Sequence, residues 1–179
     1  MANNCFYQMR VVGDKRENLE KFFRAMNWEG EYKESGVGRV YDCDMLDDIE
    51  LRADGLYEMT LAGDCAWSVQ CAMIKGVTRD FPNGLPAQSE RLNLDIEVYS
   101  EECGLEFQEH HLFKKGEHLI SDCVDWYDID LEGHEDDVEY VNELIDDYKI
   151  AEHIKTGNYK DYVEDGYLRV GGFEWKYSI

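Results

Sequence analysis

The sequence predicts an α+β fold with a ferredoxin-like split βαβ core, an extended antiparallel sheet and an added acidic helix. The first observation behind this prediction is the order of strand-like and helix-like segments, which is β-α-β-β-α-β followed by further strands. The second is that the later strand-like segments are joined by short turns, as in an antiparallel meander. The third is composition, because 44% hydrophobic and 13% aromatic residues among 179 can fill one core.

The first half of the chain supplies most of the predicted core. Leu19, Phe22, Phe23 and Met26 recur at the spacing of one helix face, and Asp14 stands where a helix N-cap is expected. The predicted elements are, in order, a strand over 5–12, a helix over 15–26, strands over 37–45 and 56–61, a helix over 66–75 and a helical turn at 88–92.

The second half of the chain predicts a meander, an acidic helix and a final hairpin. Residues 94–100 and 105–113 alternate apolar and polar side chains, as half-buried strands do. The predicted elements are strands over 94–100, 105–113 and 118–128, a helix over 136–148, a short helix over 149–155, a polar loop over 157–166 and a hairpin over 166–179 with Gly171 and Gly172 at its tip. We expect residues 1–130 to form the ferredoxin-like core and residues 131–179 to pack on it, as a single compact domain.

Charge restricts the partners of this protein. The chain has 40 Asp and Glu against 18 Lys and Arg, a net charge of −22, and its pI is 4.4. Direct binding to nucleic acid or to an anionic membrane is disfavoured, because both are polyanions. No apolar run approaches the roughly 20 residues of a membrane span. A partner that binds through charge is therefore expected to be basic, and nucleic-acid-binding proteins are the largest such class.

The six cysteines predict reduced, mostly buried thiols in a cytoplasmic protein. None of them is in C-x-x-C spacing, and no signal-like segment precedes the first predicted strand. We expect neither a catalytic nucleophile nor a cofactor, because the sequence has no nucleophile elbow, no P-loop and no G-x-G-x-x-G motif.

The stretch from Gly116 to Tyr148 has 13 carboxylates and no Lys or Arg in 33 residues. Within it Glu135, Glu139, Glu143 and Asp147 recur at every fourth position, opposite an apolar stripe of Val138, Val141, Ile145 and Tyr148. Like charges at this spacing destabilise a helix, and the stretch has no cation to compensate them. Four helical residues rise about 6 Å, which is comparable to the step between phosphates of a nucleic-acid strand. The ladder predicts polyanion mimicry, with a merely solvated acidic face as the alternative.

Short motifs in the first two thirds of the chain carry a family resemblance. They are Met1-Ala2-Asn3 before the first strand, Cys65-Ala66-Trp67-Ser68 at the second helix, Val98-Tyr99-Ser100-Glu101-Glu102, and Phe107-Gln108-Glu109-His110. In these motifs residues 1–130 resemble the YubB-type ferredoxin-like family of phages, plasmids and integrative elements. The resemblance implies a ferredoxin-like fold and a mobile-element context, and it implies no activity.

Together these features predict a non-enzymatic protein that binds and inhibits a basic, nucleic-acid-binding host defence enzyme. The mobile-element context favours an anti-CRISPR protein acting on a Cas effector, with an antirestriction role as an alternative. Trp126 is a candidate aromatic anchor at the interface. The predicted partner-binding residues are Glu135, Asp136, Glu139, Glu143, Asp146, Asp147, Asp125, Asp128 and Trp126.

Two further alternatives remain open at the level of sequence. A metal-dependent nuclease could use Glu97, Glu109 and Asp122 on adjacent strands. The pattern of an EF-hand is absent, and the histidines lack the spacing of a zinc motif. A structural protein could instead associate with itself through an apolar patch or a sheet edge, and the sequence leaves the oligomeric state open.

Overall fold

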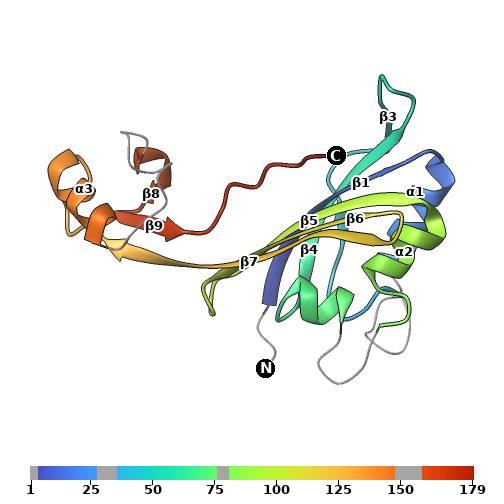
Figure 1. Ribbon diagram of the computed structural model, residues 1–179, viewed down its shortest axis with the longest axis horizontal. Coiled ribbons are helices and arrows are strands. Elements are labelled where there is room, and N and C mark those ends of the chain that lie inside the picture. Colours follow the sequence, from blue (N-terminus) through green and yellow to red (C-terminus); the bar gives the residue numbers. More distant parts are fainter. Residues whose placement is uncertain (1–3, 28–35, 76–80, 148–158) are drawn as a thin grey trace. The chain divides into compact units, whose positions relative to one another are not determined.

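The computed structural model describes residues 4–27, 36–75, 81–147 and 159–179 (Figure 1). By its internal contacts the chain divides into two units. Unit 1 is Met1–Cys123 together with Trp175–Ile179, and unit 2 is Val124–Glu174. The boundary therefore falls at residue 124 and not at the predicted residue 131, and the last five residues group with unit 1.

Unit 1 is built on an antiparallel sheet. Its strands are β1 (Asn4–Gly13), β2 (Asp44–Met45), β3 (Glu50–Leu51), β4 (Tyr57–Ala66), β5 (Leu94–Glu102), β6 (Phe107–Lys114) and the beginning of β7 (Glu117–Asp130). They lie in the order β2-β4-β1-β5-β6-β7, and β3 also pairs with β4. The long strand β1 is central and runs antiparallel to both β4 and β5. The α+β class, the antiparallel sheet and the predicted meander of β5, β6 and β7 are confirmed.

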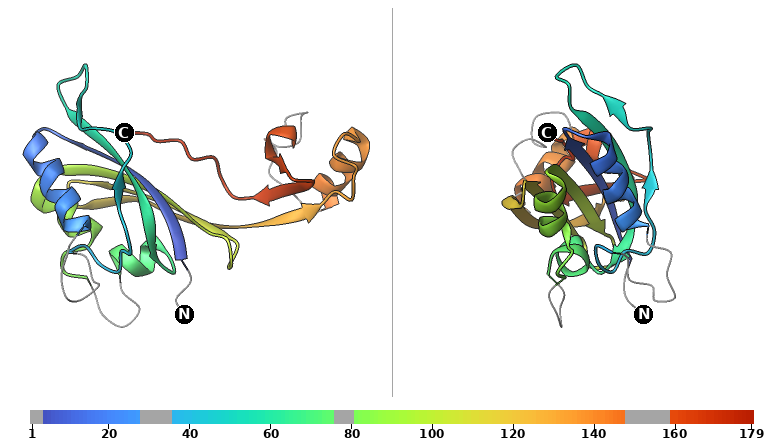
Figure 2. Two further views of the ribbon diagram at one scale, coloured as in Figure 1. Left: turned by 180° about the vertical axis from the view of Figure 1, so that it is seen from behind. Right: turned by 90° about the vertical axis from the view of Figure 1, so that its right-hand side faces the viewer.

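Three helical segments accompany this sheet, namely α1 (Arg16–Met26), the π-helix η1 (Gln70–Ile74) and α2 (Leu85–Leu92). Figure 2 shows α1 and α2 beside each other, as their mutual contacts require. The residues of β1 alternate, so that Tyr7 and Met9 are fully buried and pack in one cluster with Leu19 and Phe22 of α1. The N-cap of α1 is Lys15 without a side-chain bond, so the capping role predicted for Asp14 is wrong.

Two predicted elements of unit 1 are wrong. The strand expected over 37–45 is reduced to β2 and an isolated bridge between Val40 and Cys65. The helix expected over 66–75 is shorter, because β4 continues to Ala66 and pairs there with Asn4 of β1. Trp67 then turns the chain with a φ of 68°, which is uncommon for a bulky residue, and η1 follows. Strand pairing has overridden the helical pattern at these positions.

Unit 2 contains the end of β7, the helix α3 (Val138–Asp147), the 3-10 helix η2 (Tyr159–Tyr162) and the strands β8 (Val163–Glu164) and β9 (Tyr167–Gly171). Strand β9 pairs antiparallel with β7 and with β8. A small core joins these elements, with Leu131, Val141, Tyr159 and Leu168 fully or almost fully buried. The predicted acidic helix is confirmed over 138–147, whereas the helix predicted over 149–155 lies outside the described residues.

The C-terminal hairpin differs from the prediction. Its turn is Asp165-Gly166 between β8 and β9, where both residues have positive φ, as tight two-residue hairpin turns require. The polar loop predicted over 157–166 is therefore wrong where η2 and β8 form. Gly171 ends β9 instead of forming a hairpin tip, and a Cβ there would lie 2.5 Å from the carbonyl oxygen of Asp125. After β9 the chain makes no further strand.

Candidate functional site

Unit 2 concentrates the negative charge of the chain. Its 51 residues, Val124–Glu174, contain 16 Asp and Glu and four Lys and Arg, a net charge of 4 − 16 = −12 out of the total of −22. Most of the carboxylates whose side chains are described are exposed to solvent. The exposed ones are Asp125, Asp128, Asp130, Glu132, Asp136, Asp137, Glu139, Glu143, Asp165 and Glu174.

The predicted ladder is only partly on the helix. Glu139 and Glu143 are exposed on α3 one turn apart, and Val141 between them is fully buried in the core of unit 2. Glu135 is half-buried and lies three residues before α3 begins. Asp146 and Asp147 are the last two residues of α3, and their side chains lie outside the described part. Of the four ladder residues, the structure therefore describes two as exposed side chains on the helix, Glu139 and Glu143.

The acids just before α3 have local structural roles. The Asp137 carboxylate accepts a hydrogen bond from the backbone N–H of Tyr140 at 3.1 Å, as a helix N-cap does. The Asp136 carboxylate lies 2.6 Å from Nζ of Lys160. The hydrogen bond and charge of Lys160 lower the pKa of Asp136. Lys160, 24 residues further along the chain, therefore compensates one acid of the stretch, although the stretch itself contains no Lys or Arg.

Trp126 is part of the interior and not an exposed anchor. Only 4% of its surface is accessible, and the guanidinium carbon of Arg169 lies 3.9 Å from the ring centroid. Arg169 stands opposite Asp128 in the β7–β9 ladder, with its Nε 3.5 Å from an Asp128 carboxylate oxygen. One arginine therefore covers the ring of Trp126 and pairs with Asp128, so the ring is not exposed to a partner, whereas Asp128 is exposed. Asp125 stays exposed.

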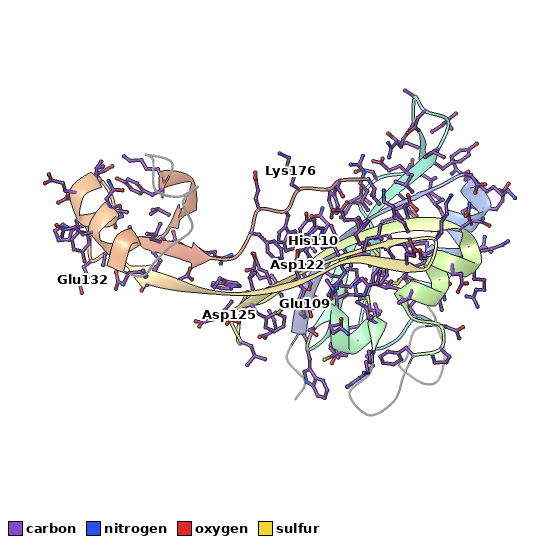
Figure 3. The ribbon with its side chains drawn as sticks, viewed as in Figure 1. Glu109, His110, Asp122, Asp125, Glu132 and Lys176 are labelled. Atoms are coloured by element: carbon purple, nitrogen blue, oxygen red, sulfur yellow. The ribbon has the colours of Figure 1, made fainter. Side chains whose placement is uncertain are left out.

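The carboxylates of the nuclease alternative do not form one site. Glu97 on β5 and Glu109 on β6 lie on opposite faces of the sheet. Glu109 bonds Ser100 of β5 and shares its face. Ser100 is three residues after Glu97 on the same strand, and residues an odd number of positions apart point to opposite faces. Asp122 of β7 is exposed. Figure 3 labels Glu109, His110 and Asp122 among the side chains. Over the described ranges, no group of three or more His, Cys, Asp or Glu is arranged to hold a metal ion.

Glu97 instead binds the C-terminal segment of unit 1, residues 175–179, through hydrogen bonds. Its side chain is completely buried, and it accepts hydrogen bonds from the backbone N–H of Ser178 at 2.6 Å and of Ile179 at 3.1 Å. His110 Nε2 lies 2.8 Å from the same carboxylate. Beside it, the Tyr99 hydroxyl donates to the carbonyl oxygen of Lys176 at 2.7 Å. The sequence carries no signal of this contact, because Glu97 stands at a polar position of an alternating strand.

A second buried polar group lies on the helix-bearing face of the sheet. The Glu109 carboxylate accepts hydrogen bonds from the backbone N–H of Gln70 and from the hydroxyl of Ser100, each at 3.2 Å. Burial raises the pKa of Glu109, but the nearby imidazole of His111, whose Nε2 lies 3.8 Å from the carboxylate, and these two donors outweigh it and hold the pKa below its ordinary value. Nδ1 of His111 lies 3.1 Å from Nε2 of His118, which links this buried group to an exposed imidazole.

We expect unit 1 to lose stability as the pH falls from about 7.5 to about 5.5. Burial, and then the charge of His111, lower the pKa of His118. The unfolded chain therefore takes up this proton near pH 6.5, before the folded chain does, so stability is complete above that pH and falls below it. Denaturant unfolding at several pH values in this range should show that the free energy of unfolding depends less steeply on pH in His118→Asn than in the wild type. His134→Asn in unit 2 is the control and should leave the slope of unit 1 unchanged, and an unaltered slope in His118→Asn would contradict the assignment.

Comparison of this chain with known proteins identified no similar protein. No protein-family model matches the sequence, and neither the curated proteins nor the solved structures gave a match. Among the described helices, none combines the length and the apolar character needed to cross a bilayer.

Proposed function

We propose that this chain is a non-enzymatic protein that binds a basic, nucleic-acid-binding enzyme through the exposed acids of unit 2 and so inhibits it. A Cas effector is the first target class, which would make the chain an anti-CRISPR protein of a mobile element acting in the host cytoplasm. The YubB-type resemblance and a ferredoxin-like core belong to this proposal.

The observation that carries the proposal is the net charge of −12 on the 51 residues of unit 2. Glu132, Glu139 and Glu143 support it most directly, because their side chains are exposed and no cation pairs with them among the described residues. Such a surface attracts a basic channel over several ångströms and speeds association with it. Once bound, its carboxylates would occupy positions that the phosphates of a guide or target strand otherwise take.

The test is inhibition of target cleavage by guide-loaded Cas9, with binding measured in parallel. Wild-type protein is expected to inhibit cleavage, and the triple variant Glu132→Gln, Glu139→Gln, Glu143→Gln to bind at least about tenfold more weakly, because exposed interface charges set the association rate. Raising the salt from about 0.1 M to about 1 M should also weaken binding, because the Debye length falls from about 10 Å to about 3 Å.

The matched control removes the same number of charges from unit 1. Asp47, Asp48 and Glu50 are exposed acids around β3, and the variant Asp47→Asn, Asp48→Asn, Glu50→Gln should inhibit like the wild type. Equal losses of inhibition in the two triple variants would show that the effect depends only on the net charge of the chain. Inhibition of a restriction endonuclease and not of Cas9 would favour the antirestriction role, and inhibition of neither would overturn the proposal.

A further inference from the structure

The first half of β7 leaves one of its edges without a partner strand. On one side β7 follows β6 in the sheet of unit 1 (Figure 1). Strand β9 pairs only with Trp126–Asp130, at the other end of β7. Among the strands that the structure describes, none pairs with the outer edge of β7 from Glu117 to Asp122.

The backbone groups that this edge presents follow from the alternation of β7. Strands β6 and β7 are joined by the two-residue turn Lys115-Gly116, where both residues have positive φ, so Lys114 and Glu117 form a hydrogen-bonded pair. In an antiparallel strand the N–H and C=O of one residue point to the same side, and successive residues alternate. Near this turn the odd-numbered residues of β7 therefore face β6, and the even-numbered residues face outward. The outward-facing residues are His118, Ile120 and Asp122, a row of donors and acceptors for an added strand.

This edge lacks the usual protection against strand addition. Exposed edges are commonly blocked by lysine, proline or a bulge, and residues 117–125 contain no Lys, Arg or Pro. Leu119 is instead 53% exposed. The flanking acids Glu117 and Asp122 are exposed, and neither forms an ion pair with a described residue.

The charge of the edge selects its occupant. A second copy of the chain would bring the same acids against Glu117 and Asp122, and like charges directly opposite each other destabilise a strand pair. An extended segment with Lys or Arg at alternate positions would gain the ladder of backbone bonds and also neutralise both acids. We propose that the outer edge of β7, from Glu117 to Asp122, binds an extended Lys- or Arg-bearing segment of a partner protein by adding it as a strand to the sheet.

This surface belongs to unit 1 and is separate from the acids proposed to mimic a nucleic acid. The test uses the full chain and a nine-residue peptide that alternates Val and Lys. Peptide binding should slow hydrogen exchange of the Ile120 and Asp122 amides. A peptide with N-methyl groups on one edge should bind on the order of tenfold more weakly, because it cannot complete the backbone bonds. A Val and Glu peptide should not bind.

Ile120→Pro provides the matched variant in the protein. Its N–H is not used inside the sheet, so proline is compatible with this edge position, and unchanged near-ultraviolet circular dichroism would show that the fold is intact. The variant should lose peptide affinity about as strongly as N-methylation does. The triple variant of Glu132, Glu139 and Glu143 should keep it, which separates this edge from the proposed function of unit 2.

Three results would overturn the proposal. The first is the absence of peptide binding. The second is binding that does not protect the Ile120 and Asp122 amides or is insensitive to N-methylation, which would indicate charge attraction alone. The third is concentration-dependent protection of the edge in the protein alone, with a dimer in sedimentation, which would assign the edge to a second copy.

Discussion

Replacing Glu97 by glutamine should lower the free energy of unfolding of unit 1 by about 3 kcal/mol and detach the C-terminal segment from β5. The carboxylate is completely buried and accepts from the backbone N–H groups of Ser178 and Ile179 and from the Ser178 hydroxyl. A carboxamide has one acceptor oxygen, and its N–H₂ would face donors in place of an acceptor. At least one buried donor is then left without a partner.

Asp95→Asn is the matched control for Glu97→Gln. Asp95 lies on the same strand and the same face, two residues earlier, with its carboxylate 4.0 Å from Nζ of Lys114 and partly exposed. The loss of such an exposed pair should change stability by less than about 1 kcal/mol. Denaturant unfolding gives the difference in stability, and hydrogen exchange of residues 175–179 reports detachment. If those amides stay as protected in Glu97→Gln as in the wild type, Glu97 does not hold the segment.

Replacing Trp126 by alanine should unfold unit 2 and leave unit 1 folded. Truncation of a buried tryptophan costs about 3–5 kcal/mol, and a core as small as that of a 51-residue unit has little stability in reserve. Trp126 is 4% exposed, and its ring carries the guanidinium of Arg169, which in turn pairs with Asp128. This one change removes the ring that Arg169 covers and so weakens the side-chain contacts between β7 and β9.

Tyr167→Ala controls for the loss of an aromatic side chain, because Tyr167 lies on β9 and is 46% exposed. Hydrogen exchange should show loss of protection in α3 and β9 of Trp126→Ala and native protection in β1 and β5, with Tyr167→Ala near the wild type throughout. If the proposed function is correct, Trp126→Ala also loses inhibition. Native hydrogen exchange in α3 of Trp126→Ala would show that unit 2 does not depend on Trp126 for its stability. Loss of protection in β1 of the same variant would show that the two units do not unfold separately.

The sequence was most informative where local pattern and tertiary environment agree. The strand over 5–12, the alternation of 94–100, the helical spacing of Leu19, Phe22 and Met26, and the apolar stripe containing Val141 predicted β1, β5, α1 and α3. In α1 the buried positions are those that the periodicity marks, because one face of the helix must leave water. Strand β5 is instead buried on both faces, and Val138 of the α3 stripe is exposed. Predictions failed at Cys65 and Ala66, where pairing with β1 outweighs a helical pattern, and at Gly171, where close approach to Asp125 uses a glycine that looks like a turn.

The candidate site divides in the same way. The excess of acid after residue 124 and the exposure of Glu139 and Glu143 follow from the sequence, because charge and helix phase are local properties. The partners of the other acids were not predictable, because Lys160 meets Asp136 and Arg169 meets Asp128 from distant positions. Glu97 shows the same limit, since it looks like a solvent-facing acid until Ser178, 81 residues later, is seen to bond it.

The sequence by itself determined the α+β class, the antiparallel meander, the amphipathic acidic helix and a charge that restricts the partner to basic molecules. These depend on residue spacing and on composition, which need no knowledge of long-range contacts. Only the tertiary structure decided that the acid-rich part is a separate unit with its own small core, that Trp126 is interior, and that Glu97 holds the chain's last residues. Those outcomes depend on side chains brought together from far apart in the chain, and a single sequence does not record which of them meet.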